Sequence, residues 1–287
     1  MVLLLCSIFT AYADEPSRGL VRLSVVPMRA AASHASEQVS QALMGTPVVI
    51  LSDDGSWSLC ETPDGYRGYI INHSLVPVTA ECMEQWRRAP RVVVISPDEV
   101  RAVDGGGAPV TDLVAGCILE VGDGGSLLTP DGRAIRILPS GIVAPFGQWA
   151  GAPFRPEALP RFASYYIGVP YLWGGLSGKG MDCSGLVRMA YMAQGRLLPR
   201  DARDQALEGE EVAAEDLQPG DLIFFGNAAT GRVTHVAIYE GGGVYVHSSQ
   251  MVRRNSLDER SPLYLPLTVL ARRRISGTPL AGHPAYF

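Results

Sequence analysis

Three side chains in the C-terminal half of this 287-residue chain have the types that nucleophilic catalysis requires: Cys183, His235 and His247. Cys183 begins a stretch whose apolar residues recur at helical spacing, which predicts that its thiol lies in the first turn of a helix. There the helix dipole and the unpaired backbone N–H groups favour the thiolate. Asp182 stands at the N-cap position, and capping alone would explain it. We expect Cys183 to be a nucleophile, with a buried structural cysteine as the alternative.

The two histidines lie in consecutive apolar segments, 233–238 and 244–247, which are joined through Glu240 and three glycines. This pattern predicts a β-hairpin. If the hairpin is centred on Gly241, the imidazoles of His235 and His247 are directly opposed, with Cβ atoms roughly 4.5 to 5.5 Å apart, and can form a hydrogen bond. A loop centred between Gly241 and Gly242 would break this register. A pair of histidines satisfied within the core is the alternative.

A thiol, a histidine beside it and a third polar group that orients the histidine form the catalytic arrangement of thiol hydrolases. The same three side chains could instead supply three zinc ligands. The sequence offers no obvious fourth ligand, and Cys183 does not belong to a Cys-x-x-Cys pair. We therefore expect neither a metal nor a cofactor.

The segments that must position these residues change in character along the chain. Residues 21–78 consist of short β-runs broken by turn residues, a pattern typical of a small β-barrel, and residues 91–143 repeat it. The tetrapeptide Thr-Pro-Asp-Gly occurs at 62–65 and at 129–132, an offset of 67 residues that suggests a duplicated module. Residues 139–160 are rich in Pro, Gly and Ala and fit a linker.

The remaining segments predict helices first and strands afterwards. Apolar residues recur at helical spacing in 161–168 and 184–194, whereas 222–226, 233–239 and 244–248 read as strands. We predict a multi-domain protein in which two small β-barrels precede an α+β domain.

Charge and hydropathy exclude several classes of partner. The formal net charge is -5, and no window has the clustered basic residues that nucleic acid would require, so we expect no nucleic-acid partner. The longest apolar run, 2–10, is shorter than the roughly 20 residues of a membrane span, so we expect no transmembrane helix.

The N-terminal run has the features of an export signal. Residues 2–10 are followed by Ala11-Tyr12-Ala13, the small-x-small pattern of a signal-peptidase site, although no basic residue precedes the run. We expect residues 1–13 to be removed on export to the periplasm or the medium. A lipid anchor at Cys6 is a weaker alternative because no small residue precedes it.

The cysteine count argues against a disulfide scaffold. Five cysteines in 287 residues are too sparse to hold the fold, so the hydrophobic core must do so. We expect Cys60, Cys82 and Cys117 to be small buried apolar residues, with at most one disulfide bridge.

At the three candidate catalytic residues the sequence resembles the NlpC-type cell-wall cysteine peptidases, whose catalytic half is papain-like. The resemblance covers roughly residues 160–262 and implies catalytic roles for Cys183, His235 and His247. It rests on five motifs: Tyr171-x-Trp173-Gly174-Gly175, Asp182-Cys183-Ser184-Gly185-Leu186-Val187, Leu198-Pro199-Arg200-Asp201, Leu217-x-Pro219-Gly220-Asp221-Leu222-x-Phe224-Phe225, and Thr234-His235-Val236-Ala237-Ile238-Tyr239.

The N-terminal half resembles the bacterial SH3-like domains of the subgroup that cleaves γ-D-glutamyl-diamino-acid bonds. Residues 37–45 and Asp64-Gly65-Tyr66-x-Gly68-Tyr69 match its signature stretches. The resemblance implies that this domain closes one end of the cleft, and that Glu37, Tyr66 and Asp182 hold the free amine of an L-Ala residue. Without the resemblance, Glu37 would be read as a surface residue and Tyr66 as a barrel residue.

The matched motifs imply further substrate-binding residues, namely Tyr171, Trp173, Ser184, Arg200 and Asp201. Tyr171 and the backbone N–H of Cys183 are candidates for the oxyanion site. The sequence departs from the pattern at Ala202, where relatives often have a serine near the D-Glu carboxylate. That contact is then either lost or supplied by Arg200, Ser184 or water.

The resemblance implies the following domains: a signal peptide at 1–13, SH3-like domains at 14–80 and 81–145, a linker at 146–160 and a catalytic domain at 161–287. It implies an endopeptidase that cleaves the γ-D-glutamyl to diamino-acid bond of peptidoglycan stem peptides with a free N-terminal L-Ala, the diamino acid being meso-diaminopimelate or lysine. An amidase or acyltransferase of the same papain-like group is one alternative. A wall-binding protein without turnover is another. The oligomeric state stays open.

Overall fold

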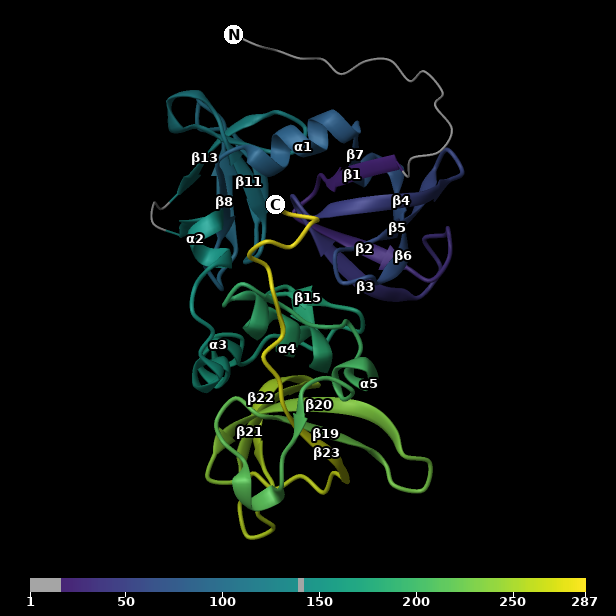
Figure 1. Ribbon diagram of the computed structural model, residues 1–287, viewed down its shortest axis with the longest axis vertical. Helices are drawn as coiled ribbons and strands as arrows, with labels where there is room; N and C mark the ends of the chain where they lie inside the picture. The colour runs from purple at the N-terminus through teal and green to yellow at the C-terminus, as the bar shows by residue number, and fades with distance from the viewer. Residues whose placement is uncertain (1–16, 139–141) are drawn as a thin grey trace.

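The computed structural model describes residues 17–138 and 142–287, and its first seven strands form one antiparallel sheet (Figure 1). The strand order is β3-β2-β6-β5-β4-β1-β7. Apolar side chains that alternate along these strands, among them Val26, Met28, Cys60 and Ile70, bury one another and close a small barrel. The strands are β1 (Ser17–Val21), β2 (Val25–Arg29), β3 (Gln38–Leu43), β4 (Pro47–Asp53), β5 (Trp57–Glu61), β6 (Arg67–Ile71) and β7 (Leu75–Val78), with the 3-10 helix η1 (Asn72–Ser74) before β7.

The next seven strands repeat this arrangement. Their order is β10-β9-β13-β12-β11-β8-β14, the first sheet's order with every strand number raised by seven. The Thr-Pro-Asp-Gly turn joins equivalent strands in both sheets, and its threonine hydroxyl donates to the aspartate in each, Thr62 to Asp64 at 2.8 Å and Thr129 to Asp131 at 2.5 Å. The predicted duplication is therefore present in the topology. The strands are β8 (Arg91–Val94), β9 (Val100–Val103), β10 (Pro109–Leu113), β11 (Ile118–Val121), β12 (Leu127–Leu128), β13 (Ala134–Leu138) and β14 (Val143–Pro145), with η2 (Asp123–Gly125) before β12.

Two short helices flank the second sheet, and the sequence pattern did not predict them. Helix α1 (Ala80–Arg88) begins at Thr79, whose side chain accepts a hydrogen bond from the Cys82 N–H, and it buries Met83 and Trp86. Helix α2 (Phe146–Ala150) lies in the stretch predicted as a linker and buries Phe146. Both helices pack into one apolar cluster, so tertiary contacts order segments that read as connections.

The C-terminal domain places helices before a six-stranded antiparallel sheet of order β18-β23-β19-β20-β21-β22. Helix α4 packs on the sheet face that carries Phe224, Val236, Ile238 and Val246, the α+β arrangement predicted above. The helices are η3 (Pro156–Ala158), α3 (Leu159–Ser164), α4 (Cys183–Met192), α5 (Ala202–Gln205) and η4 (Ala214–Asp216). The strands are β15 (Leu176–Ser177), β16 (Gly180–Met181), β17 (Arg196–Leu197), β18 (Glu210–Glu211), β19 (Leu222–Asn227), β20 (Arg232–Gly241), β21 (Val244–Ser249), β22 (Met251–Ser256), β23 (Val269–Arg274) and β24 (Thr278–Pro279).

Residues 276–287 return from this sheet past α4 to the two barrels (Figure 1). On the way β24 pairs with β17. At the end Tyr286 is buried against Phe146, and Arg91 Nη2 donates to the Tyr286 carbonyl at 2.7 Å. This C-terminal segment therefore contacts all three domains.

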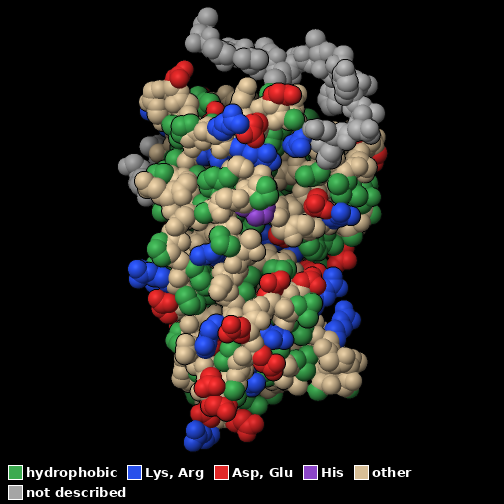
Figure 2. Space-filling view, viewed as in Figure 1, with side chains coloured by type: hydrophobic (Ala, Val, Ile, Leu, Met, Phe, Trp, Pro, Cys, Tyr) green, Lys and Arg blue, Asp and Glu red, His purple; other side chains and the backbone are tan. Residues whose placement is uncertain are grey.

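The surface and the thiols agree with a globular chain held by its core. On the face seen in Figure 2, Lys and Arg side chains are interspersed with Asp and Glu. Among the described residues Cys60, Cys82, Cys117 and Cys183 form no disulfide bridge, and Cys82 is only partly buried. Within 17–138 and 142–287 no helix is long and apolar enough to cross a membrane. The predicted signal peptide and Cys6 lie outside the described residues.

Candidate active site

Asp182 fixes the start of α4 and therefore the position of Cys183. Its Oδ1 accepts a hydrogen bond from the Gly185 N–H at 2.7 Å, as an N-cap does, and its Oδ2 accepts one from the Gly174 N–H at 2.9 Å. One carboxylate thus ties the glycine-rich loop to the helix. A Cβ at Gly185 would lie 2.1 Å from the Gly175 carbonyl oxygen, so this approach requires glycine.

The Cys183 thiol is buried beside Val236 of β20. Burial raises the pKa of Cys183 to about 11, and the negative charge of Asp182 adds to the increase. The backbone N–H groups of Val236 and Ser184 act in the opposite direction, which places the sulfur next to the residue that follows His235. Burial and the carboxylate of Asp182 therefore act against the thiolate that the helix start favours.

The hairpin register differs from the predicted one. The turn residues are Gly242 and Gly243, both with positive φ, and Gly241 pairs with Val244. The pairing then shifts at a bulge between Tyr239 and Gly241, so that Ile238 pairs with Val246. His235 and His247 are consequently diagonal rather than directly opposed. Without the extra bulge residue the two imidazoles would lie on opposite faces of the sheet.

Despite this offset, the two imidazoles form a hydrogen bond, and an asparagine extends it. His235 Nε2 lies 2.7 Å from His247 Nδ1, and His247 Nε2 lies 2.9 Å from Asn255 Oδ1. The Asn255 amide nitrogen donates to the Leu263 carbonyl at 2.7 Å, which leaves Oδ1 as an acceptor. His247 therefore donates from Nε2 and accepts at Nδ1 from His235, and the free lone pair of His235 is on Nδ1.

Asn255 was missed in the sequence because it lies on the strand after the hairpin. Asn255 pairs with Tyr245, so its side chain lies on the same face of the sheet as His247. Only the observed register shows this. Both histidines are neutral near pH 7. Burial lowers the pKa of His235 to about 3 and that of His247 to about 4.

Asp182 also forms a buried ion pair with Arg200. Arg200 Nη2 donates to its Oδ2 at 2.6 Å and Arg200 Nη1 donates to its Oδ1 at 3.1 Å. Arg200 also donates to the hydroxyls of Ser184, at 2.9 Å, and of Ser40 in the first barrel, at 3.1 Å. Because every guanidinium nitrogen has a protein partner and Arg200 is 2% exposed, it does not present a free donor to a ligand. Ala202 adds no hydroxyl nearby.

Glu37 and Trp173 meet across the boundary between the first barrel and the C-terminal domain. Trp173 Nε1 donates to Glu37 Oε1 at 2.7 Å, and Gln38 Nε2 donates to the Trp173 carbonyl at 2.8 Å. Trp173 is 59% exposed, so the pair lies at the surface of the glycine-rich loop. Asp182 holds the adjoining Gly174 from the inner side.

Tyr66 lies on the barrel side of the Asp182–Arg200 pair. Burial raises the pKa of Tyr66 to about 12, and the charges of Asp201 and Arg200 also act on it. Burial likewise raises the pKa of Tyr171 to about 12, with contributions from Cys183 and Asp182. Tyr66 therefore lies within electrostatic range of Asp182 and Asp201, and Tyr171 within range of Cys183.

This geometry does not support the alternative in which Cys183, His235 and His247 bind zinc. Of the four ring nitrogens of His235 and His247, two form the hydrogen bond between the imidazoles, and a third is hydrogen-bonded to Asn255. Within the part of the chain that the structure describes, no three His, Cys, Asp or Glu side chains are grouped to hold a metal ion.

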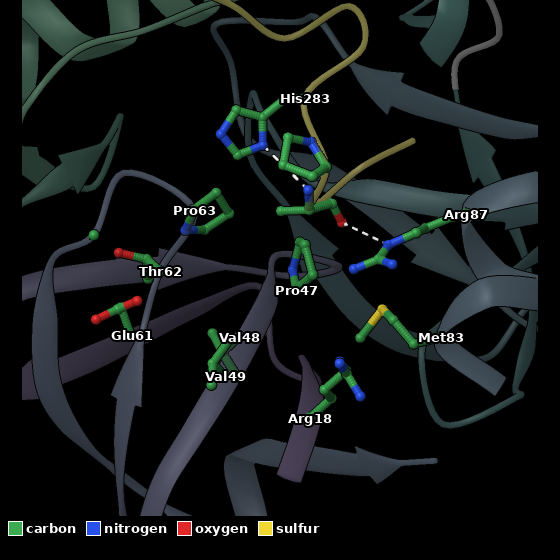
Figure 3. A pocket seen from close by; sticks show the side chains of 13 residues that line it. Arg18, Pro47, Val48, Val49, Glu61, Thr62, Pro63, Met83, Arg87 and His283 are labelled. Carbon is green, nitrogen blue, oxygen red and sulfur yellow. Dashed lines mark hydrogen bonds between the residues drawn. The ribbon is translucent and has the colours of Figure 1, made fainter. Parts of the chain in front are cut away.

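One cavity lies apart from the predicted site residues. It has a volume of about 230 Å³ and forms where the first barrel, α1 and the C-terminal segment meet (Figure 3). Arg18, Glu61, Met83, Arg87 and His283 are among the side chains that line it.

Comparisons with known proteins identify the family and the fold. Residues 168–272 match the NlpC/P60 family and residues 24–76 match the bacterial SH3 domain. The chain is 32% identical over 251 residues to the dipeptidyl-peptidase 6 of Lysinibacillus sphaericus, an alignment that covers 80% of this chain and 88% of that protein.

The chain belongs to the NlpC/P60 family.

As an NlpC/P60 protein, it is a cysteine peptidase with an SH3-like β-rich region before a papain-like domain. It is also 31% identical over 248 residues to a gamma-D-glutamyl-L-lysine dipeptidyl-peptidase of Bacillus cereus, across 77% of this chain and 70% of that enzyme. The solved structure of an NlpC/P60 family protein from Bacillus cereus has the same fold, with a TM-score of 0.76 and 22% identity over 91% of this chain and 100% of that one. The family resemblance and the fold class inferred from the sequence are confirmed.

Proposed function

We propose that this NlpC/P60 protein is an endopeptidase that hydrolyses the γ-D-glutamyl to diamino-acid bond of peptidoglycan stem peptides bearing a free N-terminal L-Ala. The observation that carries the proposal is the hydrogen-bonded series His235, His247, Asn255, which leaves His235 Nδ1 as a base beside the helix that bears Cys183. Cys183 is the nucleophile, His235 the acid and base, and His247 the orienting residue. No cofactor is required.

The reaction starts from a neutral thiol and a neutral imidazole. As Cys183 Sγ bonds to the γ-carbonyl carbon of D-Glu, its proton moves to His235 Nδ1. The C–N bond then breaks, and the departing diamino acid takes that proton on its amine. Water attacks the thioester, gives a proton to His235 and releases the L-Ala-D-Glu carboxylic acid, after which the proton returns to Sγ. The Tyr171 hydroxyl and the Cys183 N–H are the proposed oxyanion donors.

The proposed amine clamp combines Glu37 and Tyr66 of the first barrel with Asp182. Since Arg200 already neutralises Asp182, we assign the net negative charge of the clamp to Glu37. An ammonium gains a charge-assisted hydrogen bond there, and an acylated nitrogen gains none. Trp173 positions Glu37, and Arg200 with Ser184 positions Asp182. Asp201 lies beside Tyr66 at the same end of the site.

The test compares wild type with Cys183→Ala on L-Ala-γ-D-Glu-L-Lys, on its diaminopimelate counterpart and on the N-acetylated forms, with products identified by mass. Release of the free diamino acid only from free-amine peptides, and only by wild type, would support the proposal. Equal cleavage of the acetylated forms would remove the amine requirement. Glu37→Gln should abolish the preference for the free amine, whereas Glu61→Gln in the same barrel should keep it.

The same products separate the alternatives. An amidase or acyltransferase would change the mass at a different bond. A wall-binding protein would show no turnover by wild type, yet its Cys183→Ala form would sediment with purified peptidoglycan. We further propose that the protein acts outside the cytoplasm, in the periplasm or the medium, and N-terminal sequencing of the exported protein tests this together with the predicted cleavage after Ala13.

A further inference from the structure

Arg253 is a cation beside the two histidines that has no carboxylate partner. It lies directly across from His247 in the β21–β22 ladder, on the same face of the sheet. Among the described residues its side chain forms one hydrogen bond, from Nη1 to Gln250 Oε1 at 3.4 Å, and its Nε is buried without a partner. Among the described residues no Asp or Glu oxygen lies within 4.0 Å of its guanidinium, in contrast to the next residue, Arg254, whose Nε lies 2.6 Å from Glu240 Oε2.

The two arginines whose charges act on the catalytic side chains have different partners. Arg200 lies on the Asp182 side of Cys183 and is saturated by protein acceptors. Arg253 lies on the histidine side, where its charge acts on both His235 and His247. An unpaired guanidinium at this position disfavours the imidazolium that His235 must become during the reaction. Because the charge of Arg253 opposes protonation of His235 in the free enzyme, we expect an anion to compensate for this charge in the enzyme–substrate complex.

The substrate supplies such an anion if the proposed function holds. The acyl half of the substrate, with its L-Ala amine, lies toward Glu37, Tyr66 and Asp182. The departing amine must therefore lie on the His235 side, since His235 gives it a proton. In an α-amino acid a carboxylate is attached to the carbon that bears this nitrogen, so it lies within a few bonds of the proton donor.

We propose that Arg253 binds the carboxylate of the departing diamino acid, so that the enzyme prefers substrates in which that carboxylate is free. This inference rests on the proposed function and adds the recognition of the leaving half to it. The guanidinium matches a carboxylate with two parallel donors, and the partial burial of Arg253 strengthens the pair. Once the carboxylate is bound, the charge of Arg253 no longer opposes proton transfer to His235.

The test uses two peptides that differ by one charge: L-Ala-γ-D-Glu-L-Lys and the same peptide ending in lysinamide. For wild type we expect kcat/KM to be roughly 10- to 100-fold higher for the free acid, the range of a charge-assisted hydrogen bond. Arg253→Gln should reduce this ratio to about 1, mostly by slowing cleavage of the free acid. Arg254→Gln, one residue away on the opposite face and already paired with Glu240, should keep the wild-type ratio.

The possible outcomes separate this inference from the proposed function. If wild type cleaves both peptides equally, or if Arg253→Gln slows both by the same factor, the inference is wrong and the endopeptidase assignment stands. If wild type cleaves neither of these peptides and neither of the corresponding diaminopimelate peptides, both are wrong. If Arg253→Gln does not fold, Arg253→Lys replaces it. Its single ammonium should give an intermediate ratio, and an unchanged ratio would overturn the inference.

Discussion

His247 Nε2 lies 2.9 Å from Asn255 Oδ1, and this contact determines which nitrogen of each imidazole carries a proton. Because the Asn255 amide donates to the Leu263 carbonyl, its oxygen can only accept, and the tautomers of His247 and then of His235 follow. A residue outside the proposed catalytic set therefore holds the base in its active form.

Replacing Asn255 with Leu should lower kcat by roughly 10- to 100-fold, less than the effect of losing an orienting group in direct contact with the base. The expected cause is that His247 can then carry its proton on Nδ1, which faces His235. Kinetics on the stem tripeptide and the imidazole ¹⁵N spectrum would check this. Asn227→Leu, at the exposed end of β19 in the same sheet, is the matched control. An unchanged kcat together with an unchanged ¹⁵N spectrum would contradict the prediction.

The pH profile of kcat/KM should be flat from pH 7 to about pH 5. This parameter reports the free enzyme, in which the pKa of His247 is lowered to about 4 and that of His235 to about 3. Activity should fall only as the pH decreases through these values and the base becomes protonated. An acid limb centred near pH 6.5 would show that the imidazoles titrate as in water.

The same two groups make stability depend on pH. Between about pH 6.5 and pH 4 the unfolded chain binds protons at these histidines that the folded chain does not. Stability is therefore retained above this window and decreases as the pH falls through it. Urea midpoints at pH 7 and pH 5, compared between wild type and His247→Gln, should show a smaller pH dependence in the variant. Equal dependence in both proteins would argue against a neutral buried His247.

Arg200→Met should destabilise the protein by about 3 to 5 kcal/mol, because it leaves the buried Asp182 carboxylate without its ion-pair partner. The double variant with Asp182→Asn should lose less than the sum of the two single changes, and urea denaturation would measure this coupling. Arg203→Met, whose side chain is 71% exposed and pairs with Asp201, should cost less than about 1 kcal/mol. Similar losses for the two arginine variants would refute the buried-pair interpretation.

Gly185→Ala should prevent folding of the C-terminal domain, since the new methyl group would lie 2.1 Å from the backbone oxygen of Gly175. Neither the new methyl group nor the backbone oxygen of Gly175 belongs to a flexible side chain that could move away. Gly147→Ala in α2 is the control: its Cβ would meet nothing within 4 Å, and the change should stabilise the helix by about 0.5 to 1 kcal/mol. Circular dichroism and thermal melting distinguish the two. A normally folded Gly185→Ala protein would disprove the close-approach argument.

Local sequence patterns were sufficient for most strands and for the principal helix. The strands predicted at 222–226, 233–239 and 244–248 are present as β19, β20 and β21, and α4 begins at Cys183, which places the thiol in the first turn as predicted. These elements were predictable because alternation and helical periodicity depend on neighbouring residues alone.

The parts that were not predicted depend on contacts between distant residues. The bulge between Tyr239 and Gly241 changes the register of the β20–β21 hairpin, and the amino-acid composition of the hairpin does not predict this change. The protonation state of Cys183 depends on how deeply the fold buries it and on the nearby charge of Asp182. Helix α1 forms because Met83 and Trp86 find an apolar cluster that includes residues from the far end of the chain.

The C-terminal segment makes the barrels and the peptidase domain depend on one another. Tyr286 and Phe287 pack against Phe146, and the carbonyls of Ala285 and Tyr286 accept hydrogen bonds from Arg87 and Arg91 around the second barrel. A peptidase domain transferred to another protein without these barrels would carry an exposed aromatic tail, and barrels transferred alone would expose the surface that this tail covers. The barrels and the peptidase domain are therefore expected to depend on one another for covering this apolar surface.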